Sequence, residues 1–172
     1  MIAIAAVDMN WGIGKNGQLL EHISLDMKHF ARLTKGNNGH NVVIMGRKTL
    51  ESMPNGKPLP ERHNFIVSHK PAFTKDSLTY RSLNTAVKMA KIVAKNHNSS
   101  IYVIGGGSIY EQLIDKCDLA IITKIHKTYE GVDTYFPNLD EKSNWVFLDS
   151  IPHSENGIDF DFVYYYNNMI EN

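Results

Sequence analysis

Apolar residues along the chain form short uninterrupted runs that alternate with segments of helical spacing. The runs are bounded by polar turns and are too short for isolated helices, so they predict buried strands. The predicted strands are 1–7, 41–45, 63–67, 78–80, 101–104, 118–125, 145–150 and 160–167. The segments with helical spacing predict helices at 24–34, 46–53, 83–94 and 109–116, and a loop is expected at 71–77.

Strands and helices alternate until the last two strands, which have only a bend at 152–157 between them. Alternation is typical of a parallel sheet, whereas two successive strands are typical of an antiparallel hairpin. The sequence therefore predicts a three-layer α/β fold. A mainly parallel central sheet of about eight strands would have helices on both faces and end in the hairpin. No repeat, low-complexity tract or domain boundary interrupts residues 1–172, so we expect a single domain.

A glycine-rich turn joins one predicted strand directly to a helix. Gly105, Gly106 and Gly107 follow the run 101–104. This arrangement points backbone N–H groups and the positive end of a helix at an anion, usually a phosphate. The segment is neither G-x-G-x-x-G nor a P-loop, so a tight turn that needs glycine for packing is the alternative interpretation.

A second unit of the same kind begins at Gly46, where Arg47, Lys48 and Thr49 start the next helix. Cations at a helix N-terminus oppose the helix dipole, so their position is unfavourable unless an anion is bound. A solvated helix end is the alternative, but the pattern favours phosphate binding. Both glycine turns follow strands, and ligands of parallel sheets bind at the carboxyl ends of the strands.

An acidic residue lies beside the apolar face of the first predicted helix. Asp26 shares this face with Phe30 and Leu33, which must face the core. The commoner explanation is a first-turn acid that the helix dipole favours. The other is a carboxylate in an apolar pocket, held for a cationic or amide-bearing ligand. The helix by itself favours the first explanation.

The overall composition argues against several classes of protein. The 172 residues are 42% apolar and 21% charged, with a formal net charge of zero, which is ordinary for a globular protein. A neutral chain argues against a broad nucleic-acid or anionic-membrane surface. Cys117 is the only cysteine, and the eight histidines are scattered without metal-ligand spacing. We expect a cytosolic monomer with no metal, nucleic-acid or membrane partner.

Six segments, in this order along the chain, resemble the motifs of dihydrofolate reductases. They are residues 5–8 with 12–14, 26–30, 43–49, 58–62 with Asn64, 104–112 and 130–137. The resemblance covers nearly the whole chain. It implies NADPH-dependent reduction of 7,8-dihydrofolate to 5,6,7,8-tetrahydrofolate, a reaction that supports one-carbon and thymidylate metabolism.

The resemblance also implies roles for residues of the substrate site. Asp26 would hold the 2-amino group and N3 of the pterin and favour protonation at N5, with Thr123 as its hydrogen-bonding neighbour. Hydride would then move to C6. Arg62 would pair with the α-carboxylate of the glutamate tail. The apolar walls would be Ile4, Ala6, Met27, Phe30, Met53, Leu59 and Ile104.

For the cofactor, the resemblance implies that NADPH lies across both glycine turns. Its 2′-phosphate would lie among Arg47, Ser68, His69 and Arg81. The other implied cofactor contacts are Ala6, Ile13, Gly14, Gly46, Lys48, Thr49, Gly105, Gly106, Gly107, Ser108, Ile109 and Tyr110.

Three positions depart from the family pattern. Leu19-Leu20-Glu21 stands where the family commonly has Leu-Pro-Trp, Ser24 where a proline usually starts the helix, and Ser108 where a cation is frequent. Glu21 places a second carboxylate near Asp26, and like-charge repulsion would raise the pKa of one of them.

Two alternatives to the reductase remain at this point. One is an NADPH-dependent pyrimidine reductase of riboflavin synthesis with the same fold, which should lack the pair Asp26 and Arg62. The other is a binding module that keeps the nucleotide site without the chemistry.

Overall fold

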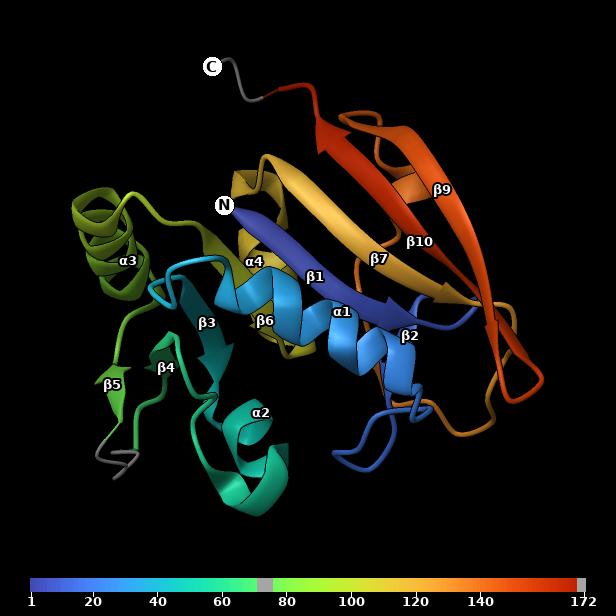
Figure 1. Ribbon diagram of the computed structural model, residues 1–172, viewed down its shortest axis with the longest axis horizontal. Helices are drawn as coiled ribbons and strands as arrows, with labels where there is room; N and C mark the ends of the chain where they lie inside the picture. The colour runs from blue at the N-terminus through green and yellow to red at the C-terminus, as the bar shows by residue number, and fades with distance from the viewer. Residues whose placement is uncertain (71–75, 170–172) are drawn as a thin grey trace.

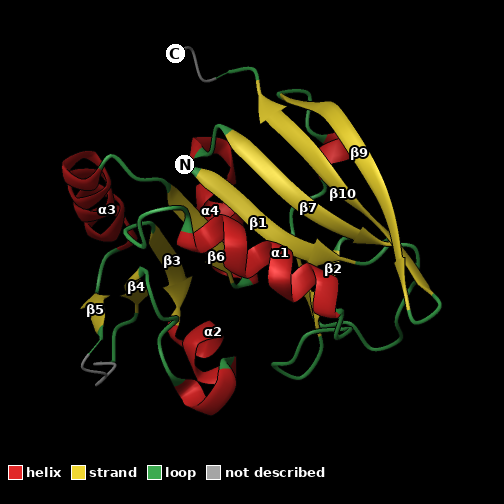
Figure 2. Cartoon of the chain, viewed as in Figure 1, coloured by secondary structure: helices red, strands yellow, loops and turns green. Residues whose placement is uncertain are grey.

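The computed structural model describes residues 1–70 and 76–169, and its main feature is one eight-stranded sheet (Figures 1 and 2). The strand order is β5-β4-β3-β6-β1-β7-β10-β9. Neighbours from β5 to β7 are parallel, and β10 is antiparallel to both β7 and β9. The strands are β1 (Ile2–Val7), β3 (Val42–Gly46), β4 (His63–Val67), β5 (Ser77–Tyr80), β6 (Ile101–Gly105), β7 (Leu119–Ile125), β9 (Trp145–Glu155) and β10 (Ile158–Asn167). The predicted fold class is confirmed, and the loop expected at 71–77 lies mostly outside the described residues.

Helices cover both faces of this sheet. The helices are α1 (Ser24–Lys35), α2 (Arg47–Ser52), α3 (Leu83–His97) and α4 (Gly107–Leu113), with 3-10 turns η1 (Pro54–Gly56), η2 (Ile114–Lys116) and η3 (Leu139–Glu141). Phe30 of α1 and Leu50 of α2 pack into one apolar cluster, whereas Ala90 of α3 and Leu113 of α4 pack into another. Strand residues alternate between the two clusters, as the period of two requires, so α1 and α2 share one face and α3 and α4 the other. None of the described helices has both the length and the apolar character to cross a membrane.

The C-terminal hairpin is longer than expected. The predicted bend at 152–157 is wrong, because β9 continues to Glu155 and only Asn156 and Gly157 form the turn. Both turn residues have positive φ, 51° and 77°, as a two-residue hairpin turn of type I′ requires. Pro152 lies inside β9, which is tolerated because β9 is an edge strand whose outer N–H groups need no partner strand.

Two segments outside the predicted strands pair with each other. β2 (Gly12–Gly14) and β8 (Thr134–Tyr135) form a small antiparallel sheet. Trp11, which precedes β2, is 4% exposed and stacks on Phe136 with ring centroids 6.0 Å apart. The early loop, residues 9–17, is therefore held against the core by Trp11 and against the late loop, residues 126–137, by the pairing of β2 with β8.

The start of α1 is held from the far end of the chain. No side chain caps this helix locally, because Ile23 occupies the N-cap position. Instead, the Glu155 carboxylate accepts hydrogen bonds from the backbone N–H groups of Ser24 at 2.6 Å and Leu25 at 3.0 Å. The hairpin thereby supplies the anion that the helix N-terminus favours, and it fixes the turn of α1 that carries Asp26.

Candidate functional site

The two glycine turns lie side by side because they follow β3 and β6, which are adjacent and parallel. A Cβ on Gly46 would lie 3.5 Å from Ile109 at the start of α4, and one on Gly106 would lie 3.4 Å from Thr49 of α2. Each turn therefore contacts the first turn of the helix that follows the other. The N-cap residues of α2 and α4 are Gly46 and Gly106, which have no side chain that could cap the first backbone N–H groups of these helices.

Gly105 and Gly107 are glycines for reasons of space. Gly105 has φ +122°, and a Cβ there would lie 3.3 Å from the ring of Tyr110. At Gly107, a Cβ would lie 3.0 Å from Thr134 and 3.1 Å from the carbonyl oxygen of Tyr135 in β8. The packing interpretation of this turn thus accounts for two of its glycines. It does not account for the uncapped N–H groups beside them.

Polar residues follow several strands at the same edge of the sheet. The backbone N–H of Ser68, after β4, donates to the carbonyl of Tyr80 at 2.9 Å, so Ser68 lies next to Arg81 after β5. His69, Arg81 and Lys48 are exposed. Arg47 forms an ion pair with Glu51 one helical turn further on. The residues expected around the 2′-phosphate therefore follow the carboxyl ends of β3, β4 and β5. One of them, Arg47, is already paired with the carboxylate of Glu51.

Asp26 of α1 faces the sheet rather than bulk solvent. Its Oδ1 accepts a hydrogen bond of 2.5 Å from the hydroxyl of Thr123 on β7, and Thr123 is 3% exposed. Burial raises the pKa of the Asp26 carboxyl above its ordinary value, while the hydrogen bond from Thr123 acts in the opposite direction. Desolvation dominates, so this carboxyl binds a proton more readily than one in water.

Apolar side chains lie on the same face of the sheet as Asp26. Ile4 and Ile104 are buried, and the half-buried Phe30, Met53 and Leu59 pack against the same cluster. Ala6 is paired with Thr123 in the register of β1 and β7, which places it beside the partner of Asp26. Met27, expected among the walls, is 38% exposed and is not part of this cluster.

Arg62 is an ionisable group held near the end of α1. Its Nη1 donates to the Thr34 hydroxyl at 2.8 Å and its Nε to the Pro60 carbonyl at 2.8 Å. Burial lowers the pKa of its guanidinium, and the nearby Glu61 carboxylate raises it. The side chain is thus fixed against the end of α1.

Asn64 fixes the loop before β4. Its amide accepts a bond from the Leu59 N–H and donates to the carbonyls of Leu59 and Arg62, at 2.8 to 3.1 Å. The sequence shows Asn64 only as part of a motif. Thr34 carries no signal there, because its contact with Arg62 spans 28 residues.

Comparison with known proteins decides the family. A model of the dihydrofolate reductase family matches residues 1–167. The dihydrofolate reductase of Bacillus subtilis is 35% identical over 166 residues, covering 94% of this chain and 91% of that protein. That of Drosophila melanogaster is 35% identical over 172 residues, covering 92% and 93%. That of Schistosoma mansoni is 36% identical over 180 residues, covering 94% and 93%.

The chain belongs to the dihydrofolate reductase family.

Within this reductase fold, Asp8 organises both loops that border the site. It follows β1, is 1% exposed, and its Oδ1 accepts bonds from the N–H groups of Asn10 at 2.9 Å and Gly12 at 2.8 Å. Its Oδ2 accepts a longer bond of 3.3 Å from the N–H of Tyr129 in the late loop. The sequence shows only a polar residue at a strand end, which does not reveal this role.

The departure at Glu21 has a different effect from the one expected. The Glu21 carboxylate accepts a 2.7 Å hydrogen bond from the Tyr129 hydroxyl and lies 3.5 Å from Nζ of Lys127. The Tyr129 bond, with help from Lys127, lowers the pKa of Glu21. Repulsion from Glu21 is not a cause of the raised pKa of Asp26, so the like-charge expectation is wrong and burial takes its place.

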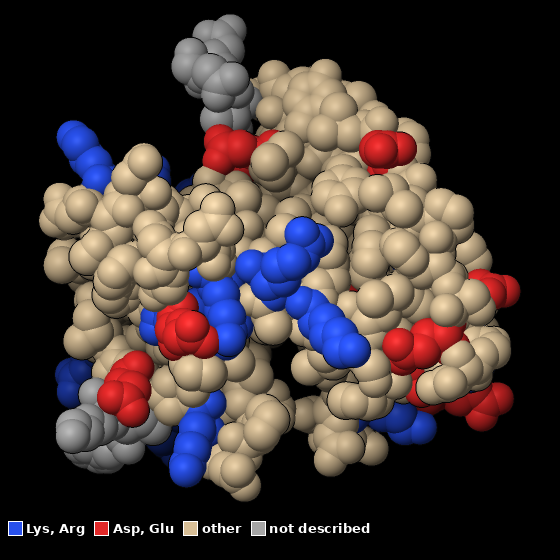
Figure 3. Space-filling view, in the orientation of Figure 1, with Lys and Arg blue, Asp and Glu red and all other residues tan. Residues whose placement is uncertain are grey.

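A hollow opens beside Leu19, Leu20 and Tyr129. About 630 Å³ of space is lined by Lys15, Asn16, Gln18, Leu19, Leu20, Tyr129 and Glu130. Figure 3 shows an opening between the region of α2 and the loop after β2, with Lys and Arg side chains over α1 beside it. Leu19 and Leu20, two of the residues that depart from the family pattern, thus line a hollow whose lining includes none of the expected site residues.

Three of the residues expected to contact the cofactor pack in or against the apolar core. Tyr110 is 4% exposed, and its hydroxyl donates to the carbonyl of Ile4 at 2.7 Å, while its backbone N–H donates to the carbonyl of Gly106 at 3.0 Å. Ile109 is also buried, and Ile13 of β2 packs against the same core. Gly14 accepts a backbone bond from Asp133 at 3.1 Å, which ties β2 to the late loop.

Proposed function

We propose that the protein reduces 7,8-dihydrofolate to 5,6,7,8-tetrahydrofolate with NADPH as the reductant. The observation that carries this proposal is the desolvated Asp26 carboxyl of α1, which accepts a hydrogen bond from Thr123 of β7. The same sheet carries two glycine turns, at which α2 and α4 begin without a side-chain cap from their N-cap residues. One polar anchor among apolar walls suits a flat heterocycle that must be held in a dry slot. The product would support one-carbon and thymidylate metabolism.

The residues at the edge of the sheet fit NADPH. The backbone at Gly46 and Gly106 has no Cβ to block close approach, and the uncapped starts of α2 and α4 favour anions such as a pyrophosphate. Arg47, Ser68, His69 and Arg81 would hold the 2′-phosphate that distinguishes NADPH from NADH, while Lys48, Thr49 and Ser108 would contact its other phosphates. Bound there, NADPH supplies the hydride that reduces C6.

Asp26 has two tasks in this proposal. Its carboxylate would accept hydrogen bonds from the 2-amino group and N3 of the pterin, which fixes the ring in one orientation. Its raised pKa would favour protonation at N5, which together with the hydride balances the reaction. Thr123 orients the carboxyl by donating to Oδ1.

The substrate would extend from Asp26 along α1 towards Arg62. The apolar walls around the pterin and aminobenzoyl rings would be formed by the cluster that excludes Met27, namely Ile4, Phe30, Met53, Leu59 and Ile104, together with Ala6. The Arg62 guanidinium, already fixed by Thr34 and Pro60, would pair with the α-carboxylate of the glutamate tail.

The decisive experiment measures the loss of NADPH absorbance when dihydrofolate is added to the purified protein. We expect turnover with NADPH, slower turnover with NADH, and none without dihydrofolate. Tight NADPH binding without turnover would instead support a non-catalytic binding module. Turnover of a pyrimidine precursor of riboflavin, but not of dihydrofolate, would support the other reductase.

A further inference from the structure

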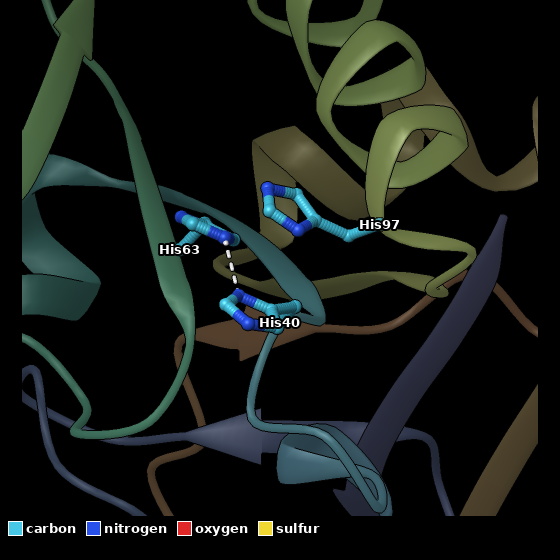
Figure 4. A group of neighbouring side chains, drawn as sticks. All are labelled: His40, His63 and His97. Atoms are coloured by element: carbon cyan, nitrogen blue, oxygen red, sulfur yellow. Dashed lines mark hydrogen bonds between the residues drawn. The ribbon is translucent and has the colours of Figure 1, made fainter.

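Three histidines from separate segments lie close together near the amino ends of β3 and β4, whereas the glycine turns lie at the carboxyl ends of β3 and β6. His40 lies just before β3, His63 is the first residue of β4, and His97 is the last residue of α3. One ring nitrogen from each lies within 4.8 Å of the other two (Figure 4). The expectation that the histidines are scattered is therefore wrong in space, although these three are far apart in the sequence.

Hydrogen bonds to backbone groups hold the three segments together without involving the imidazole rings. The Asn38 side chain accepts from the N–H of His40 at 3.1 Å and donates to the carbonyl of His97 at 3.3 Å. The Ser99 hydroxyl donates to the His40 carbonyl at 2.9 Å. The N–H of His63 donates to the carbonyl of Asn41 at 2.9 Å. The convergence of the rings is thus built into the fold of this edge.

We propose that His40, His63 and His97 form a binding site for a divalent transition metal ion, with Zn²⁺ as the expected ion and water as its fourth ligand. Imidazole nitrogens bind Zn²⁺ at about 2.0–2.1 Å, so two ligands of a tetrahedral site lie about 3.3 Å apart. Nδ1 of His40 and Nε2 of His63 are 3.3 Å apart. The nitrogen of His97 lies within 4.8 Å of the other two, so it would move closer to them when the ion binds.

Two simpler explanations account for only part of the cluster. A hydrogen bond between neutral rings explains the contact of His40 with His63 but leaves the nitrogens of His97 unused. Stacking explains the contact of His40 with His97, whose ring centroids are 4.3 Å apart at 13°. Neither explains why His63 and His97 also lie close together, with ring centroids 5.3 Å apart. A metal ion uses all three rings at once.

The metal site lies on the other face of the sheet from the proposed chemistry. His97 belongs to α3, which packs on the face opposite α1 and Asp26. Arg62, next to His63 in sequence, bonds to Thr34 of α1. A bound ion would therefore tie the turn before β3, the start of β4 and the end of α3 together, and would stabilise this edge without touching substrate.

Calorimetric titration of Zn²⁺ into the chelator-treated full-length protein tests the proposal. We expect one equivalent to bind, and His40→Gln or His97→Gln to lower the affinity by at least about 100-fold, because even outer-shell changes lower it 10–100-fold. His22→Gln removes an exposed histidine outside the cluster and should bind like the wild type. Zn²⁺ should raise the urea midpoint of the wild type and of His22→Gln, but not of the cluster variants.

Two further measurements keep the test independent of folding and of reductase activity. Co²⁺ in the wild type should give the visible absorption of a four-coordinate site, and addition of Zn²⁺ should abolish it. In the wild type, Zn²⁺ should shift the imidazole NMR signals of three histidines only. Wild-type Zn²⁺ affinity in His97→Gln, equal losses in His22→Gln, shifts spread over all eight histidines, or no Zn²⁺ binding would each overturn the proposal.

Discussion

Asp26 and Glu21 are five residues apart, yet the fold gives their carboxyl groups opposite properties. Burial raises the pKa of Asp26, whose side chain accepts a hydrogen bond from Thr123. Glu21 lies before α1, where the Tyr129 hydroxyl and Lys127 lower its pKa. The environment of Asp26 excludes water from its carboxyl, so that this group can take up a proton more readily. The environment of Glu21 provides hydrogen-bond donors to its carboxylate, so that this group stays ionised and links two segments of the chain.

The beginning of α1 separates these two environments. Glu21 precedes the helix and remains with the loops, whereas Asp26 lies in its first turn and faces the sheet. The position of that turn depends on Glu155, which caps the helix from the hairpin. The following changes test this contrast, from the largest expected effect to the smallest.

Asp26→Asn should lower turnover at neutral pH by about 10²–10⁴-fold, the usual contribution of a positioned acid or base. NADPH affinity should stay within about twofold, because the cofactor residues lie at the glycine turns. Steady-state kinetics and NADPH titration measure the two effects. Glu21→Gln is the matched control and should retain most turnover, so similar losses in both variants would contradict the contrast.

Arg62→Leu should weaken dihydrofolate binding by about 10- to 100-fold, the effect of losing a charge-assisted hydrogen-bond pair. Equilibrium titration of the substrate measures this change. A pterin without the glutamate tail is the control and should bind wild type and variant equally. Unchanged dihydrofolate affinity would remove Arg62 from the substrate site and leave Asp26 as its only ionisable anchor.

Glu155→Ala should lower the free energy of unfolding by about 1 kcal/mol, because the start of α1 loses its remote cap. It should also raise the KM for dihydrofolate, since Asp26 lies one residue beyond the capped N–H groups. Urea unfolding and kinetics measure both. Asp149→Ala, an exposed change on the same strand, should alter stability by less than about 0.5 kcal/mol.

The two acids should also give opposite pH dependences of stability. The folded protein protonates Asp26 more readily than the unfolded chain does, so the stability from Asp26 falls as pH rises from the unfolded pKa to the folded one. Asp26→Asn should therefore gain stability relative to wild type across this window.

For Glu21 the sign is reversed. Its lowered pKa gives stability that is present above the unfolded pKa and is lost as pH falls through the folded pKa. Glu21→Gln should become less stable relative to wild type as pH rises, by a few tenths of a kcal/mol at most, because its ion-pair partner Lys127 is exposed and the interaction is screened. Urea unfolding of both variants at a series of pH values measures the slopes. Parallel slopes would contradict the contrast.

The smallest effect should be on the pH profile of turnover in Glu21→Gln. Because burial rather than Glu21 raises the pKa of Asp26, the profiles of wild type and variant should superimpose. A shift of the profile would show that the two carboxyl groups interact. Tyr129→Phe removes the donor and keeps the carboxylate, so it separates loss of the loop contact from loss of charge.

The pattern of apolar residues was sufficient for the fold class and for the order of strands and helices. Burial on both faces requires continuous apolar runs, and such runs are visible in any one segment, for example 101–104. Asp26 was also visible as an acid beside an apolar face, and Gly46 and Gly106 as glycines before helices. These are local properties, which propensity and periodicity report directly.

Contacts between distant segments could only come from the tertiary structure. Thr123 bonds to Asp26 across 97 residues, Glu155 caps Ser24 across 131, and Tyr129 bonds to Glu21 across 108. A sequence shows that a residue is acidic, but the surrounding fold decides whether water or donors surround it. That is why the sequence identified Asp26 as a candidate, whereas only the structure showed that burial, and not Glu21, raises its pKa.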